Sequence, residues 1–178
     1  MLHLIEDLAS HVVPLVGYPM AHVFLSVDGQ LPAPEHMDQI RPLDQQAANF
    51  LWKFQHDVRL IMFPPDSGKY FRSCEKLAFG EGEQQRVKKW LYECGIPFDT
   101  TCVLSFQPGC AFLLTWKMVI HYSKDLFFGH DTVVWDRSLN WALYYDHNDV
   151  FHFAKDRIYD GEAEQLKTLE LLKQLKLV

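Results

Sequence analysis

The chain has 178 residues, of which 48% are hydrophobic and 22% are charged. This composition is typical of a folded globular protein, and it excludes a disordered tail, a collagen-like fibre and a low-complexity linker. The net charge of −6 does not favour nucleic-acid binding. An acidic chain would attract basic partners, if it has any. The length predicts a single domain over residues 1–178, since no internal repeat or linker divides the sequence.

The N-terminus and the cysteines predict a reduced, cytoplasmic protein. The first segment has no basic region and carries Glu6 and Asp7, which is unlike a secretory signal. No apolar run approaches the roughly 18 residues of a membrane span, so we expect no membrane partner. The cysteines form no CxxC pair, which argues against a zinc ribbon or a thioredoxin-like motif, and we expect no cofactor. Their positions are Cys74, Cys94, Cys102 and Cys110.

Helical and strand-like patterns alternate over the first two thirds of the chain. The helix expected over 82–94 has the clearest end, because Gly95 can adopt the left-handed conformation and Pro97 prevents the helix from resuming. Residues 110–122 are almost continuously apolar, and their length favours a buried helix over a strand, although their periodicity does not decide. The expected helices cover residues 2–12, 43–56 and 82–94, and the expected strands cover residues 21–27, 60–63 and 102–106.

The C-terminal third predicts an antiparallel meander followed by a helix. Strands are expected over residues 132–135, 141–145 and 150–153, because short turns separate these apolar runs. The final helix begins near Asp160, and basic residues in its last turn match the helix dipole. The elements together predict an α+β domain in which an antiparallel sheet carries helices packed on one face.

The meander offers a candidate protein-binding face. Its aromatic residues are interleaved with aspartates, and strand alternation would place some of the rings on the solvent side of the sheet. Trp and Tyr are enriched at binding hot spots, and an acidic rim would recruit a basic partner. The alternative is that the rings belong to the core. The candidate binding residues are Trp135, Trp141, Tyr144, Tyr145, Asp146 and Asp149.

A thiol enzyme is the alternative function. Cys110 lies at the expected start of a helix, where the positive helix end would favour the thiolate. His130 or His147 would act as the base, and Asp131 or Asp146 would orient it. A cysteine followed by a histidine and an acid on strands is the order found in papain-like and transglutaminase-like enzymes. The competing interpretation is an inert core thiol.

Histidines and aspartates are also concentrated between residues 121 and 152. Imidazole and carboxylate groups suit zinc or iron, but no HxH or HExxH spacing occurs, and residues 146–149 have the composition of a turn. We therefore expect no metal site. The residues considered are His121, His130, Asp131, Asp146, His147, Asp149 and His152.

Several short segments of the C-terminal third, taken in their order along the chain, form a recognisable pattern. They are Thr115-Trp116-Lys117, Phe127-Phe128-Gly129-His130-Asp131, Leu139-Asn140-Trp141, Asp146-His147-Asn148-Asp149 and Phe153. This pattern, within residues 113–160, resembles the C-terminal part of small bacterial immunity proteins, which bind a secreted toxin, and the rest of the chain has no counterpart. The resemblance implies an acidic, cytoplasmic, non-enzymatic protein that neutralises a basic partner by occlusion.

Overall fold

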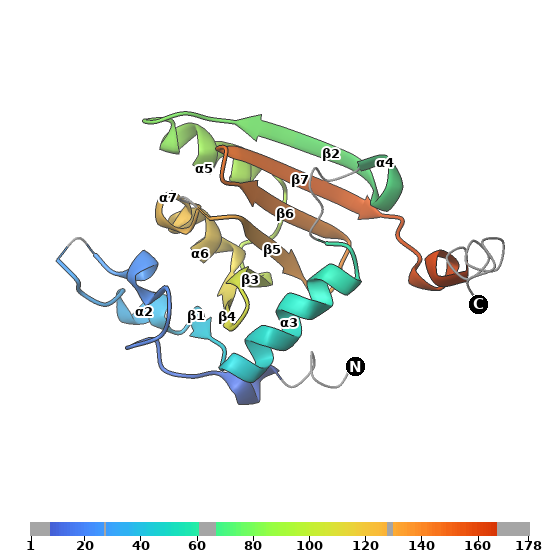
Figure 1. The fold of residues 1–178 in the computed structure, drawn as a ribbon. Helices are drawn as coiled ribbons and strands as arrows, with labels where there is room; N and C mark the ends of the chain where they lie inside the picture. Colours follow the sequence, from blue (N-terminus) through green and yellow to red (C-terminus); the bar gives the residue numbers. More distant parts are fainter. Residues whose placement is uncertain (1–7, 27, 61–66, 128–129, 167–178) are drawn as a thin grey trace.

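Within the part of the chain that the structure describes, a seven-stranded antiparallel sheet organises the fold (Figure 1). The structure is a computed structural model, and it describes residues 8–26, 28–60, 67–127 and 130–166. The strands lie across the sheet in the order β1-β4-β3-β5-β6-β7-β2. Their bounds are β1 (Ile40–Pro42), β2 (Phe71–Ala78), β3 (Thr101–Gln107), β4 (Cys110–Thr115), β5 (Thr132–Asp136), β6 (Trp141–Asp146) and β7 (Val150–Arg157).

Helices and 3-10 turns connect the strands, and the two longest of those described confirm the helices expected over 43–56 and 82–94. Asp44 begins the first of them, because its Oδ1 accepts a 2.8 Å hydrogen bond from the backbone N–H of Ala47. Gly95 follows the second with a φ of 76°. The bounds are η1 (Leu8–His11), η2 (Ala21–Phe24), α2 (Pro34–Met37), α3 (Gln45–Asp57), α4 (Ser67–Tyr70), α5 (Gln84–Glu93), α6 (Trp116–His121) and α7 (Ser123–Leu126).

The sheet confirms the α+β class and the C-terminal meander. In that meander β5 pairs with β6, β6 pairs with β7, and one row of partners runs from Val133 to Tyr144 to His152. The meander continues into β2, which pairs antiparallel with β7 along the edge of the sheet. The sequence did not predict β2, because its residues 72–76 are mostly polar and contain no β-branched side chain.

Helices cover both faces of the sheet, not one face as expected. Leu51 and Phe54 of α3 pack in one core with Val133 of β5 and Val103 of β3. Helices α5, α6 and α7 pack in a second core on the opposite face. The reason lies in the strands themselves, because β3, β4 and β6 are buried at almost every position and so bury both of their faces.

Two expected elements differ from the structure. Residues 21–24 form the 3-10 turn η2 and not a strand, because the backbone N–H groups of Ala21 and Val23 bond back to the carbonyls of Tyr18 and Met20. Residues 110–122 divide into β4 and α6. Thr115 makes the division, since its hydroxyl accepts a hydrogen bond from the backbone N–H of Met118 and begins the helix.

Other expectations lie partly outside the described residues. Of the helix expected over 2–12, residues 8–11 form η1, and residues 1–7 are not described. The strand expected over 60–63 lies outside the described residues except for Leu60. The C-terminal helix is present over residues 161–166, and its expected continuation is not described.

Candidate functional site

The four aromatic residues expected to form a binding face are buried. Their exposed fractions are 0% for Trp135, 5% for Trp141, 3% for Tyr144 and 1% for Tyr145. Trp135 and Tyr144 belong to the core beside α3, and Trp141 and Tyr145 belong to the core on the opposite face. The expectation of solvent-facing rings is therefore wrong, because both faces of β6 are covered.

Trp135 shows how firmly these rings belong to the core. Its Nε1 donates a 3.2 Å hydrogen bond to Oε1 of Gln55, which lies on α3 and is fully buried. Its ring centroid lies 5.6 Å from that of Phe54 on the same helix. Trp135 thus joins α3 to β5 by packing and by a hydrogen bond, and its role is structural.

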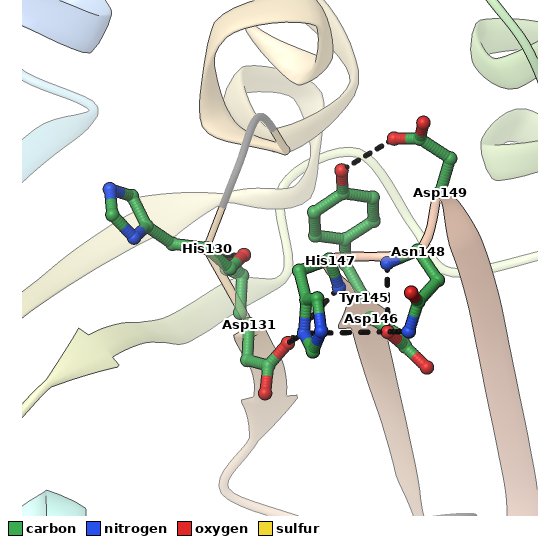
Figure 2. Close-up of polar contacts among 8 residues, drawn as sticks. His130, Asp131, Tyr145, Asp146, His147, Asn148 and Asp149 are labelled. Atoms are coloured by element: carbon green, nitrogen blue, oxygen red, sulfur yellow. Dashed lines mark hydrogen bonds and ion pairs between the residues drawn. The ribbon is translucent and has the colours of Figure 1, made fainter.

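The polar members of the predicted site gather at one end of the meander (Figure 2). Asp131 precedes β5, while His147 and Asp149 lie in the turn between β6 and β7, and all three are exposed. Asp146 ends β6 and is buried. Its Oδ1 accepts hydrogen bonds from the backbone N–H of Asn148 at 2.8 Å and from its Nδ2 at 2.6 Å. These bonds hold the turn and so determine where its side chains lie.

Asp149 occupies a restricted backbone position in this turn. Its φ is 61°, in the left-handed region that suits the last residue of a three-residue hairpin loop. Glycine is usual at such a position, and aspartate and asparagine tolerate it better than most other residues. The Oδ1 of Asp149 accepts a 2.8 Å hydrogen bond from the hydroxyl of Tyr145 (Figure 2). A charged side chain is thereby held at the surface by a buried tyrosine.

His147 and Asp131 form an ion pair across the ends of β5 and β6. The Nδ1 of His147 lies 2.8 Å from Oδ1 of Asp131, and the backbone N–H of His147 donates to the same oxygen at 3.0 Å. This hydrogen bond raises the pKa of His147 above its usual value. Burial alone would raise the pKa of Asp131, but hydrogen bonds from His147 and Tyr144 outweigh it and lower that pKa.

Three of the residues considered as metal ligands do come together. Asp131, Asp146 and His147 offer ligand atoms within 4.8 Å of one another, and two carboxylates with one imidazole are a donor set that suits zinc or manganese. Each of the three also has a protein partner, as described above, and these partners account for the geometry. His130 points away from His147 (Figure 2).

A hollow of about 410 Å³ opens beside residues 147–149, which form the turn between β6 and β7 and which we call the acidic turn. It lies between the start of α5, the helix α7 and Asp149, and it combines an apolar interior with charged groups at its edge. Its lining residues are Phe79, Gly80, Glu81, Gln84, Val87, Ser123, Lys124, Phe127 and Asp149. Of these lining residues, only Asp149 was among the binding residues expected from the sequence. The others come from segments that are far apart in the chain, so their spacing gave no signal of a shared hollow.

The structure does not activate Cys110. The residue begins β4 rather than a helix, so the argument from a helix end does not apply. It is 1% exposed, and its Sγ lies 3.5 Å from the carbonyl oxygen of Pro19. Burial raises the pKa of the thiol to about 11, although a hydrogen bond with Tyr18 acts in the opposite direction. Neither His130 nor His147 is among its hydrogen-bond partners in the described part of the chain, and the environment is that of a core thiol.

Comparisons with known proteins give no relative from which a function could be taken. No model of a protein family matches the chain, and neither a curated protein nor a solved structure matches it. Among the described helices, none is both long enough and apolar enough to cross a membrane. The acidic residues at one end of the meander and the hollow beside them are therefore the features that indicate a function.

Proposed function

We propose that the chain is a non-enzymatic, cytoplasmic protein-binding protein of the bacterial toxin-immunity type. It neutralises a basic partner by covering the partner's active site. The surface that binds is the acidic end, which we define as the exposed residues Glu81, Asp131, His147 and Asp149 together with the buried Asp146, which holds the turn between β6 and β7. This surface replaces the aromatic sheet face, whose rings are unavailable because they are buried.

The observation that carries the proposal is the convergence of carboxylates at one end of the sheet. Asp131 and Asp146 come within 4.8 Å of the same histidine, and Glu81 and Asp149 border one hollow. Carboxylates that converge in this way create a negative potential, which speeds the association of a basic partner and selects against acidic ones.

The second support is that the three aspartates of the acidic end are held in place before any partner arrives. Each of these aspartates accepts a side-chain hydrogen bond: Asp149 from Tyr145, Asp146 from Asn148 and Asp131 from His147. Side chains that are already ordered lose less entropy on binding, so more of the contact free energy is available for affinity. Occlusion needs no catalytic group, which agrees with the burial of Cys110.

The test is a quantitative capture experiment with three tagged baits. They are the unchanged chain, the variant Asp131→Asn/Asp149→Asn, and a control, Glu35→Gln/Glu162→Gln, which removes the same charge from exposed positions elsewhere in the sequence. Captured proteins from the native host are identified and quantified by mass spectrometry. We expect the unchanged chain and the control to retain one basic protein in stoichiometric amount.

The double aspartate variant should retain about tenfold less of that protein, which corresponds to a loss of roughly 1.4 kcal/mol from two charges at the interface. Asparagine keeps the shape of the side chain and tolerates the backbone of Asp149, so the fold should be preserved. Equal capture by all three baits, or capture of an acidic protein, would contradict the proposal.

A further inference from the structure

We infer that the hollow beside the acidic turn receives an arginine side chain of the partner. This inference rests on the proposed function, and it names the group that the acidic end recognises. The volume of about 410 Å³ is near the lower end of the roughly 300–1,000 Å³ of small-molecule sites. Such a space suits one long side chain better than a cofactor or a strand.

The interior of the hollow suits the apolar stem and flat head of arginine. Val87 and Phe127 are buried, and Phe79 is half-buried. The ring of Phe79 stacks on Phe151, with 5.2 Å between centroids, which holds the Phe79 ring in position. A guanidinium group can stack on such a ring while its methylene groups contact the apolar wall.

The charges at the edge of the hollow favour a cation. Glu81 and Asp149 supply two carboxylates, and Lys124 supplies one ammonium group. Within the described part of the chain, the Oδ1 of Asp149 accepts one hydrogen bond, from Tyr145, whereas a carboxylate can accept about four. Asp149 therefore keeps capacity for the paired N–H groups of a guanidinium, which lysine cannot offer in the same planar arrangement.

An anion is the main alternative occupant, because α5 begins at this hollow. Glu83 is the residue that precedes α5, and its side chain makes no capping hydrogen bond to the helix. Its Oε2 instead accepts a 2.7 Å hydrogen bond from the backbone N–H of Gly80, which also lines the hollow. The Oε1 of Glu83 accepts a further 2.7 Å hydrogen bond from Arg86. The carboxylate of Glu83 next to the start of α5, together with Glu81 and Asp149 at the edge of the hollow, would repel an anion.

The test uses two small probes and NMR. The ¹⁵N-labelled chain is titrated with N-acetyl-arginine methylamide and with its citrulline counterpart, which has nearly the same shape but no charge. We expect the arginine probe to shift the amide signals of Gly80, Glu81, Lys124 and Asp149 along a saturable curve in the millimolar range. The citrulline probe should bind about fivefold more weakly, as should the arginine probe with Asp149→Asn or Glu81→Gln. The control variant Glu162→Gln should bind the arginine probe like the unchanged chain.

Equal shifts with both probes, or shifts that lie away from the hollow, would overturn the inference. Its failure is distinct from a failure of the proposed function. If the arginine probe does not shift these signals but partner capture still depends on Asp131 and Asp149, the inference falls and the proposed function stands. If the arginine probe binds as expected but capture does not depend on these aspartates, the arginine site stands and the proposed function falls.

Discussion

The hydroxyl of Tyr145 donates a 2.8 Å hydrogen bond to Oδ1 of Asp149. Tyr145 is 1% exposed, and its ring lies 5.2 Å from Phe151 and 5.7 Å from Phe127 between centroids. The bond therefore connects the core to a carboxylate at the surface. Tyr145 acts on the acidic end by positioning Asp149, and no partner can reach its ring while the chain is folded.

The first prediction separates the two roles of Tyr145. Tyr145→Phe removes one hydrogen bond and should lower the free energy of unfolding by about 1 kcal/mol. Tyr145→Ala also leaves a cavity in the core and should lower it by about 3–5 kcal/mol. Urea denaturation measures both. If Tyr145→Ala unfolded at the same urea concentration as the unchanged chain, the ring would not belong to the core.

The second prediction concerns the hydrogen bond between Trp135 and Gln55. Trp135→Phe leaves the buried Oε1 of Gln55 without its donor and should lower the free energy of unfolding by about 1–3 kcal/mol. Introducing Trp135→Phe into a Gln55→Leu background should lower it by less, because the acceptor is already gone. A double-mutant cycle gives the coupling between the two side chains. Additive losses would show that the hydrogen bond does not contribute.

The third prediction is a titration of His147. Its pKa is raised in the folded chain, so the ion pair with Asp131 stabilises fully below the unfolded pKa of about 6.5 and is lost as the pH rises through the folded pKa. The pKa of Asp131 is lowered, so its contribution is present above about 3.9 and is lost as the pH falls through its folded pKa.

The ion pair therefore contributes most between about pH 4 and 6.5. NMR titration of the imidazole protons should give a pKa for His147 above its ordinary value, and Asp131→Asn should bring it down. A pKa that did not respond to this substitution would exclude the ion pair in solution.

The fourth prediction concerns Cys110. Since burial raises the pKa of its thiol to about 11, iodoacetamide at pH 8 should leave Cys110 unmodified in the folded chain and modify it after denaturation. Peptide mass spectrometry resolves the four cysteines. Rapid modification of Cys110 in the folded chain would restore the thiol enzyme as a hypothesis.

The sequence predicted elements whose signals are local. Helix α5 was recognisable because its apolar positions recur at helical spacing and Gly95 and Pro97 follow it in the sequence. The structure confirms the end, since Gly95 adopts a φ of 76°. The meander was recognisable because short turns separate its strands. The run of apolar residues after Cys110 was ambiguous, because its division depends on one hydrogen bond of Thr115.

The site was less predictable than the fold. Tyr144 and Tyr145 lie on opposite faces of β6, and both are buried. The alternation of residues along one strand cannot show whether a second layer of helices covers the outer face of the sheet. Asp149 was expected as a binding residue and Asp131 as an acid of the alternative thiol enzyme, and the structure places both at one end of the meander. The hollow was missed, because only tertiary contacts bring Phe79 and Phe127 together with Asp149.

The most direct test of the central claim is hydrogen exchange of the chain in complex with the partner that the unchanged bait retains. If the acidic end is the binding surface, backbone amides of residues 79–84 and 145–149 should exchange more slowly in the complex, while those of α3 should be unchanged. Slower exchange confined to α3 or to the outer strand β2, with residues 145–149 unaffected, would contradict the claim.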